Sequence, residues 1–175
     1  MKLSLVIPCY NEQDNVELFY NTATEAFKDK GFEYELIFVN DGSRDQTMDK
    51  LRHIYDIADE NVKVVGFSRN FGKESAIYAG LKESRGEMVC LIDADMQQRP
   101  ELVLDMMEIL DNDPSYDAVA CYQKNRKESK VLSAFKNAFY KTINKVSEIE
   151  FKSGASDFRL LRRCVVLSLI HISEP

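Results

Sequence analysis

Residues 88–100 read MVCLIDADMQQRP, a stretch in which two aspartates directly follow an apolar run. The run, residues 88–92, suits a buried strand, and Asp93 and Asp95 come behind it. In an extended chain, residues i and i+2 point to the same side, so we expect the two carboxylates to face one way. At a separation of ~4 Å they would repel by about 4 kcal/mol at an effective dielectric of about 20, a cost that a divalent cation removes.

This D-x-D pair predicts a metal site for Mg²⁺ or Mn²⁺. Carboxylate oxygens in a partly open site are the ligands that these ions share with substrate phosphates. The alternative is an acidic surface loop, because D-x-D alone is a weak signal. Its position behind an apolar run favours the metal site.

Apolar runs and helical patterns alternate along the chain, which predicts an α/β fold with a mostly parallel, Rossmann-like sheet flanked by helices. A helix that starts at Asn11 as N-cap is expected over 11–31, and Ser43 is expected to open the next one. In such sheets ligands bind outside the carboxyl ends of the strands. The remaining elements are expected as strands at 3–7, 34–39, 62–67, 87–92 and 118–122, and as helices over 72–84, after Pro100 and over 132–146.

Composition excludes several classes of protein. The 175 residues are 45% hydrophobic and 30% charged, which is typical of one globular domain. A net charge of -6 argues against nucleic-acid binding. The four cysteines form no C-x-x-C pair, and the two histidines follow no predicted strand, so neither a zinc site nor a serine–histidine triad is expected. No stretch approaches the ~20 apolar residues of a membrane-spanning helix.

The other strand ends also carry polar or aromatic groups. PCYNE at 8–12 lacks the glycine patterns of dinucleotide and P-loop enzymes, and Tyr10 offers a ring on which a base can stack. Asp41 suits ribose or base contacts, but on the residues alone a tight turn at Asp41-Gly42 is the favoured interpretation. Lys73 lies near a helix start, where anions are favoured, although ordinary surface charge explains it equally.

The motifs VIPCYNE, FVNDGSRD, SRNFGKESAIYAGL, LIDADMQQRPE and SDFRLL, in this order and spacing, resemble family 2 glycosyltransferases. More narrowly, the chain resembles the polyprenyl-phosphate glycosyltransferases, including bactoprenol glucosyltransferases and dolichyl-phosphate mannose synthases. The resemblance covers residues 1–163 and implies a GT-A fold. It implies a metal-dependent hexosyltransferase that moves a sugar, with inversion, from a nucleotide sugar such as UDP-glucose to a polyprenyl phosphate such as undecaprenyl phosphate, for cell-envelope glycan modification.

The resemblance also implies roles for individual residues. It assigns metal binding to Asp95 and Asp93, with Asp95 the main ligand, and phosphate binding in catalysis to Arg126. Asp157 matches a proposed catalytic aspartate, with an ion-pair role beside Arg159 or Arg126 as the alternative. The expected nucleotide contacts are Pro8, Tyr10, Glu12, Asp41, Lys73, Asp93 and Gln97.

The chain departs from the family pattern at the turn after the D-x-D pair and, most of all, at its end. Gln98 and Arg99 replace an aspartate and a proline of many relatives, and SLIHISEP does not follow the family pattern. We therefore expect residues 1–163 to form a GT-A catalytic domain that is truncated at its C-terminal end, followed by an atypical tail, 164–175.

The expected partners are a nucleotide sugar, a polyprenyl phosphate and the cytoplasmic side of the plasma membrane, where full-length relatives are anchored; a homo-oligomer is left open. Residues 124–145 hold seven basic residues and one acidic residue, which suits an anionic membrane surface. A helix there that packs on the sheet is the alternative. A non-catalytic nucleotide-sugar-binding module is the alternative function, while a sugar-nucleotide pyrophosphorylase and a haloacid-dehalogenase-type phosphatase fit the motif positions less well.

Overall fold

A computed structural model describes residues 1–58, 60–122 and 155–172. The chain divides into two compact units, residues 1–119 with 157–175 and residues 120–156, and the site described below lies in the first. The predicted helix over 132–146 and the predicted phosphate ligand Arg126 lie outside the described residues.

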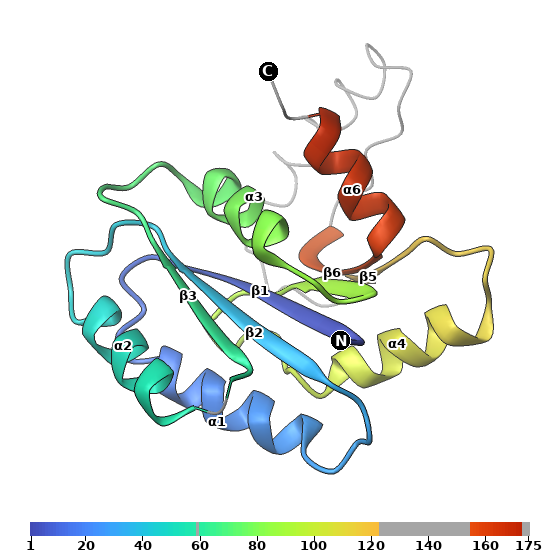
Figure 1. The fold of residues 1–175 in the computed structure, drawn as a ribbon, viewed down its shortest axis with the longest axis horizontal. Coiled ribbons are helices and arrows are strands. Elements are labelled where there is room, and N and C mark those ends of the chain that lie inside the picture. Colours follow the sequence, from blue (N-terminus) through green and yellow to red (C-terminus); the bar gives the residue numbers. More distant parts are fainter. Residues whose placement is uncertain (59, 123–154, 173–175) are drawn as a thin grey trace, which may run out of the picture. The chain divides into compact units, whose positions relative to one another are not determined.

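The sheet has six strands in the order β3-β2-β1-β4-β6-β5 (Figure 1). Pairs β1–β2, β2–β3 and β1–β4 are parallel, which confirms the predicted α/β class, and β4–β6 is antiparallel. The strands are β1 (Leu3–Cys9), β2 (Tyr34–Asn40), β3 (Val62–Gly66), β4 (Met88–Leu91), β5 (Ala118–Tyr122) and β6 (Ala155–Arg162). The helices are α1 (Val16–Phe27), α2 (Thr47–Ile57), α3 (Lys73–Glu83), α4 (Leu102–Asn112) and α6 (Arg163–Ile172).

Helices cover both faces of the sheet, which is why the central strands are continuous apolar runs. On one face, Val6 and Ile37 of the sheet join Ala76 of α3 and Val166 of α6 in one buried cluster. On the other, Phe19 of α1 packs edge-on against Phe38 of β2 at a centroid distance of 6.1 Å. In Figure 1, α3 and α6 lie on one side of the sheet and α1, α2 and α4 on the other.

Two helix starts differ from the prediction. Asn11 has a positive φ of 56° and lies in a turn, so α1 begins only at Val16. Helix α2 begins at Thr47 rather than Ser43. In both places the polar side chain that suits an N-cap instead takes part in hydrogen bonds between the β1–α1 loop and the β2–α2 loop.

Strand β6 and helix α6 were not predicted as elements. In β6 the side chains alternate, with Asp157 and Arg159 exposed and Phe158 and Leu160 buried, and this period-2 pattern was the available signal. Helix α6 begins one residue before the tail that we expected to be atypical and takes up most of it, and its Val166 is fully buried. Among the described residues, no helix is long and apolar enough to span a membrane.

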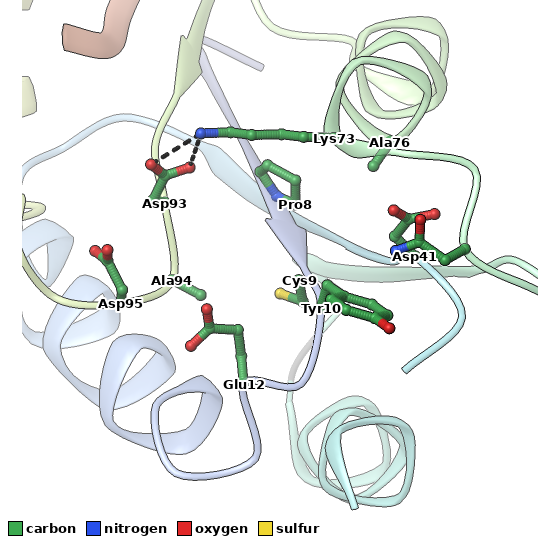
Figure 2. A pocket seen from close by; sticks show the side chains of 11 residues that line it. Pro8, Cys9, Tyr10, Glu12, Asp41, Lys73, Ala76, Asp93, Ala94 and Asp95 are labelled. Carbon is green, nitrogen blue, oxygen red and sulfur yellow. Dashed lines mark hydrogen bonds and ion pairs between the residues drawn. The ribbon is translucent and has the colours of Figure 1, made fainter. Parts of the chain in front are cut away.

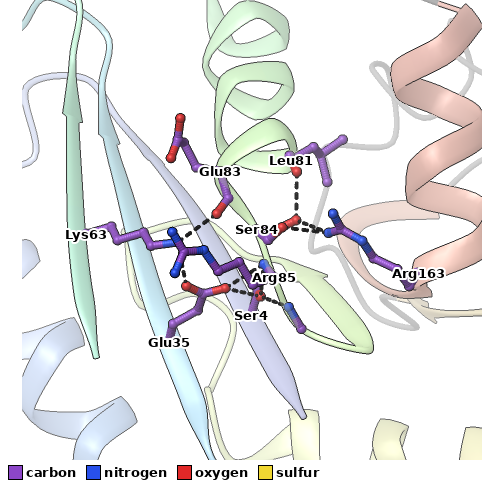
Figure 3. Close-up of polar contacts among 9 residues, drawn as sticks. Ser4, Glu35, Lys63, Leu81, Glu83, Ser84, Arg85 and Arg163 are labelled. Atoms are coloured by element: carbon purple, nitrogen blue, oxygen red, sulfur yellow. Dashed lines mark hydrogen bonds and ion pairs between the residues drawn. The ribbon is translucent and has the colours of Figure 1, made fainter. Parts of the chain in front are cut away.

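The amino ends of the strands enclose a buried polar network, at the opposite end of the sheet from the strand-end motifs (Figure 3). Glu35 Oε1 accepts hydrogen bonds from Ser4 Oγ at 2.6 Å and from the Arg85 N–H at 2.7 Å. Its other oxygen lies 2.8 Å from Lys63 Nζ. Burial alone would raise the pKa of Glu35, but the hydrogen bonds from Lys63, Ser4 and Arg85 outweigh it and the pKa is lowered.

Candidate active site

The strand order places a crevice between β1 and β4. The chain passes from β3 at one side of β1 to β4 at the other, and ligands of open α/β sheets bind at such a switch point. The β1–β4 pairing ends at Val6, whereas β1 continues beside β2 to Cys9. Pro8, in that extension, has no N–H to donate to a neighbouring strand, which suits the place where β4 separates.

A pocket of about 290 Å³ occupies this crevice, close to the lower end of the usual range for small-molecule sites (Figure 2). Its walls come from the ends of β1 and β2, the start of α3 and the turn after β4. The lining residues are Pro8, Cys9, Tyr10, Glu12, Asp41, Asn70, Lys73, Ala76, Asp93, Ala94 and Asp95.

The structure therefore brings most of the predicted site residues together. Six of the seven expected nucleotide contacts and both expected metal ligands line the pocket. Tyr10 is 42% exposed, so its ring is accessible for stacking. Gln97 is not among the lining residues; its side chain is exposed, and its N–H donates to Asp95 Oδ1 at 3.0 Å.

Hydrogen bonds tie the β1–α1 loop to the β2–α2 loop. The Asn11 N–H donates to Ser43 Oγ at 3.0 Å, and Asn11 Oδ1 accepts from the Arg44 N–H at 2.9 Å. Thr47 is fully buried; its hydroxyl accepts from the Glu12 N–H at 2.8 Å and donates to Asp45 Oδ1 at 2.6 Å. This chain of contacts positions Glu12 on the pocket wall.

Asp45 is a positioning residue that the sequence prediction missed. Its Oδ1 also accepts from the Thr47 N–H at 3.0 Å, and its Oδ2 accepts from the Gln13 N–H at 3.2 Å. Desolvation alone would raise the pKa of Asp45, but its bonds to Thr47 and Gln13 outweigh it and lower the pKa. The available signal was the spacing Asp45-x-Thr47, an acceptor two residues before a helix start.

Asp41 is almost completely buried, and both its carboxylate oxygens are hydrogen-bonded to the loop before α3. Oδ1 accepts from the Phe71 N–H at 2.7 Å, and Oδ2 accepts from the Gly72 N–H at 3.0 Å. The same loop places Asn70 on the pocket wall and carries the Arg69 guanidinium 4.2 Å from the centre of the Phe71 ring. Nucleotide contact by Asp41 stays a prediction, and loop positioning is the role that its contacts show.

Lys73 joins two acidic residues that are far apart in the sequence. Its Nζ lies 2.8 Å from Asp93 Oδ1 and 3.0 Å from Asp157 Oδ2. Burial works to lower the pKa of Lys73, but its hydrogen bonds and charge attraction to Asp93 and Asp157 outweigh burial, and the pKa is raised. The ion pair expected as the alternative role of Asp157 had Arg159 or Arg126 as its partner, whereas the structure pairs Asp157 with Lys73.

The two aspartates of the D-x-D pair do not share the extended geometry that we expected. Strand β4 ends at Leu91, and a turn follows in which Met96 has a positive φ of 60°. Asp93 is turned toward Lys73, whereas Asp95 lies farther along the turn (Figure 2). The pairing of β4 with β1 and with β6 extends as far as Leu91.

The pocket's acidic side chains suit a divalent cation. Glu12, Asp93 and Asp95 present hard carboxylate oxygens to the same pocket, the donor type that Mg²⁺ and Mn²⁺ prefer. Within residues 1–58, 60–122 and 155–172, no three histidine, cysteine or acidic side chains are grouped to hold a metal ion by themselves. The carboxylates that line the pocket are of the donor type that could hold such an ion.

Cys9 lies on the pocket floor but has no reactive character. Burial is the main cause that raises the pKa of its thiol, and the charges of Glu12 and Asp93 raise it further. The thiol therefore stays protonated at neutral pH and acts as a small buried side chain. The four cysteines, all of which lie within the described part of the chain, form no disulfide there.

Similarity to known proteins agrees with the resemblance seen in the sequence. The chain is 38% identical over 175 residues to the uncharacterized glycosyltransferase sll0501 of Synechocystis, covering 99% of this chain and 54% of that protein. It is 35% identical over 175 residues to the bactoprenol glucosyl transferase of Shigella phage SfX, covering 99% and 56%. The chain thus spans about half the length of the curated relatives it matches.

A solved structure identifies the fold as GT-A. The mannosyltransferase PcManGT from Pyrobaculum calidifontis, in complex with GDP-Man and Mn²⁺, superposes with a TM-score of 0.70 at 20% identity, covering 96% of this chain and 46% of that one. The family model described as Glycosyl transferase family 2 matches residues 4–168, nearly the whole sequence. The chain therefore belongs to glycosyl transferase family 2.

Proposed function

We propose that this chain is the catalytic domain of an inverting glycosyltransferase that moves glucose from UDP-glucose to a polyprenyl phosphate such as undecaprenyl phosphate. The observation that carries the proposal is the pocket at the β1–β4 switch point, which is lined by an exposed aromatic ring, four acidic side chains and an ammonium group. The relatives named bactoprenol glucosyl transferase support both the sugar and the lipid acceptor.

The pocket groups divide into two sets, which suit the base and the diphosphate of a nucleotide sugar. Tyr10, at the end of β1, offers its ring to the base, beside the loop that Asp41 holds in place. Asp93 and Asp95 line the same pocket after β4, and in this proposal they lie nearest the diphosphate. A bound Mg²⁺ or Mn²⁺ would neutralise charge on the departing diphosphate as a Lewis acid.

The proposed reaction is an in-line displacement. A phosphate oxygen of the lipid forms a bond to the anomeric carbon, the bond from that carbon to the diphosphate oxygen breaks, and UDP leaves. A phosphate monoester has its second pKa near about 6, so the attacking group is already mostly dianionic at neutral pH. Asp157 is proposed either to orient the acceptor phosphate or to accept a proton from the fraction of it that is still a monoanion. Arg126, which lies outside the described residues, is proposed to bind the acceptor phosphate.

The setting follows from the acceptor. A polyprenyl phosphate lies in a membrane, so we propose that the domain works at the cytoplasmic surface of the plasma membrane. Residues 124–145 lie outside the part of the chain that the structure describes. Their basic sequence suits binding to anionic lipid head groups.

A thermal-shift panel tests donor binding. UDP-glucose with Mn²⁺ should raise the melting temperature by a few degrees, as expected for a ligand well above its dissociation constant, and more than GDP-mannose does. Asp95→Asn should remove the Mn²⁺-dependent part of the shift, whereas Asp105→Asn, on the exposed face of α4, should leave it unchanged.

Transfer to a short-chain polyprenyl phosphate then tests the reaction. The product should carry glucose with the anomeric configuration opposite to that of the donor, as read by NMR. Donor binding without any transfer, in a chain extended to the length of its relatives, would favour a nucleotide-sugar-binding module instead.

A further inference from the structure

We propose that the ammonium of Lys73 and a divalent cation compete for the carboxylate of Asp93. Lys73 is then a positioning residue, which holds Asp93 and Asp157 together and gives up Asp93 when the metal binds. This inference rests on the proposed function only in taking the pocket as a site for a metal and a nucleoside diphosphate.

Both oxygens of Asp93 are engaged by one ammonium group. Lys73 Nζ lies 2.8 Å from Oδ1 and 3.0 Å from Oδ2, so the lysine faces the carboxylate across both oxygens. A metal ion that binds Asp93 on the side that faces Lys73 takes one of these positions. A metal ion and an ammonium group on the same carboxylate repel each other, which favours displacement of the lysine as the metal binds.

Asp95 differs from Asp93 in this respect. Its Oδ1 accepts a hydrogen bond from the Gln97 N–H. This donor is neutral, so it does not offset the negative charge of the carboxylate. We therefore expect the ion to reach Asp95 first, and the exchange of lysine for metal to take place at Asp93.

The exchange also affects Asp157. The same ammonium lies 3.0 Å from Asp157 Oδ2, and Lys73 begins α3 while Asp157 belongs to β6, so one side chain joins two elements at the pocket. When Lys73 leaves Asp93, its long flexible side chain is free to meet a phosphate oxygen of the donor. Metal loading would then change the partner of Asp157 at the moment when the donor is in place.

The side chains are accessible enough for such an exchange. The exposed fractions are 40% for Lys73, 28% for Asp93 and 60% for Asp157. An ion pair at this exposure contributes little to folding, so replacing Lys73 should leave the domain folded. Its effect should appear in cation binding instead.

The test is a titration of Mn²⁺ into the purified protein without nucleotide, with free Mn²⁺ measured by electron paramagnetic resonance. Lys73→Met removes the competing ammonium and should tighten Mn²⁺ binding about two- to fivefold, the range that a half-exposed ion pair supports. Lys73→Arg keeps the charge and should bind Mn²⁺ like the wild type. Lys30→Met is the matched control, because it removes one exposed positive charge from the loop between α1 and β2.

Equal Mn²⁺ affinity in the wild type and Lys73→Met would overturn the inference, and so would weaker binding in Lys73→Met. An equal gain in Lys30→Met would overturn it too, since net charge would then explain the effect. Repeating the titration with UDP separates the two proposals: nucleotide-dependent Mn²⁺ binding with no effect of Lys73→Met contradicts the inference alone. No Mn²⁺ binding in any variant, with or without UDP, contradicts both the metal site and the inference.

Discussion

The carboxylate of Asp41 accepts a hydrogen bond from the backbone N–H of Phe71 at 2.7 Å, across 30 residues of sequence. Its second oxygen accepts from the next N–H, that of Gly72, at 3.0 Å. The end of β2 thus holds the loop that leads into α3, and that loop supplies Asn70 and Lys73 to the pocket.

Replacing Asp41 should therefore affect stability and binding together. Asp41→Asn places an amide N–H₂ against one of the two backbone donors, and we expect a loss of about 1–3 kcal/mol in the free energy of unfolding. Binding of UDP and GDP should weaken by the same factor, because the loop is shared by both. Urea denaturation and calorimetric titration measure the two effects, with the exposed Asp56→Asn as control. Weaker binding of UDP with unchanged binding of GDP would instead indicate that Asp41 contacts the base directly.

Gly42 should tolerate no side chain. Its φ is 63°, and an added Cβ would collide with the backbone of Arg69 and Asn70. Gly31 is the matched control, because it has a similar φ of 74° but nothing within 4 Å of an added Cβ. Gly31→Ala should cost about 1–2 kcal/mol for the left-handed conformation alone, and Gly42→Ala clearly more. Equal costs by chemical denaturation would show that the close approach to Arg69 is unimportant.

Asp45→Ala should loosen the contact between the β1–α1 and β2–α2 loops. The change removes the acceptor of the Thr47 N–H and hydroxyl and of the Gln13 N–H, and we expect a loss of about 1–2 kcal/mol. Because Glu12 is positioned through Thr47, the KM for the donor should rise more than kcat falls. Asp49→Ala, which breaks an exposed pair with Arg52, should change neither quantity. A fall in kcat at unchanged KM would contradict this positioning role.

Glu35 should make the domain sensitive to acid. Its pKa is lowered in the folded state from an ordinary value of 4.5, so the unfolded chain binds the proton more readily. Its contribution to stability is therefore complete above about pH 4.5 and is lost as the pH falls through the lower, folded-state pKa. Stability curves against pH should show this slope in the wild type.

Glu35→Gln should flatten that acid slope and should lower stability at neutral pH by about 1–3 kcal/mol, because Lys63 loses its charged partner. Glu33→Gln is the control, since Glu33 is 79% exposed in its pair with the N-terminus. An unchanged acid slope in Glu35→Gln would show that another group causes it.

Much of the fold could be predicted because its signals are local. The run Leu3–Cys9 is apolar on both faces, which indicates a central parallel strand, and the helices between the strands show a 3.6-residue period. Strand-end acids such as Asp93 then meet at one edge, since parallel strands end on the same side. The helix starts were harder, because Asn11 and Ser43 are good N-caps whose side chains are used between loops.

The sequence by itself determined the alternation of strands and helices, because burial requires hydrophobic residues at short, regular spacings. It also determined the family motifs at the carboxyl edge of the sheet. Only the tertiary structure decided that β6 pairs antiparallel with β4, that Asp41 serves the α3 loop, and that Lys73 joins Asp93 to Asp157. Contacts of this kind link residues tens of positions apart. They depend on strand register and turn geometry, which no local pattern specifies.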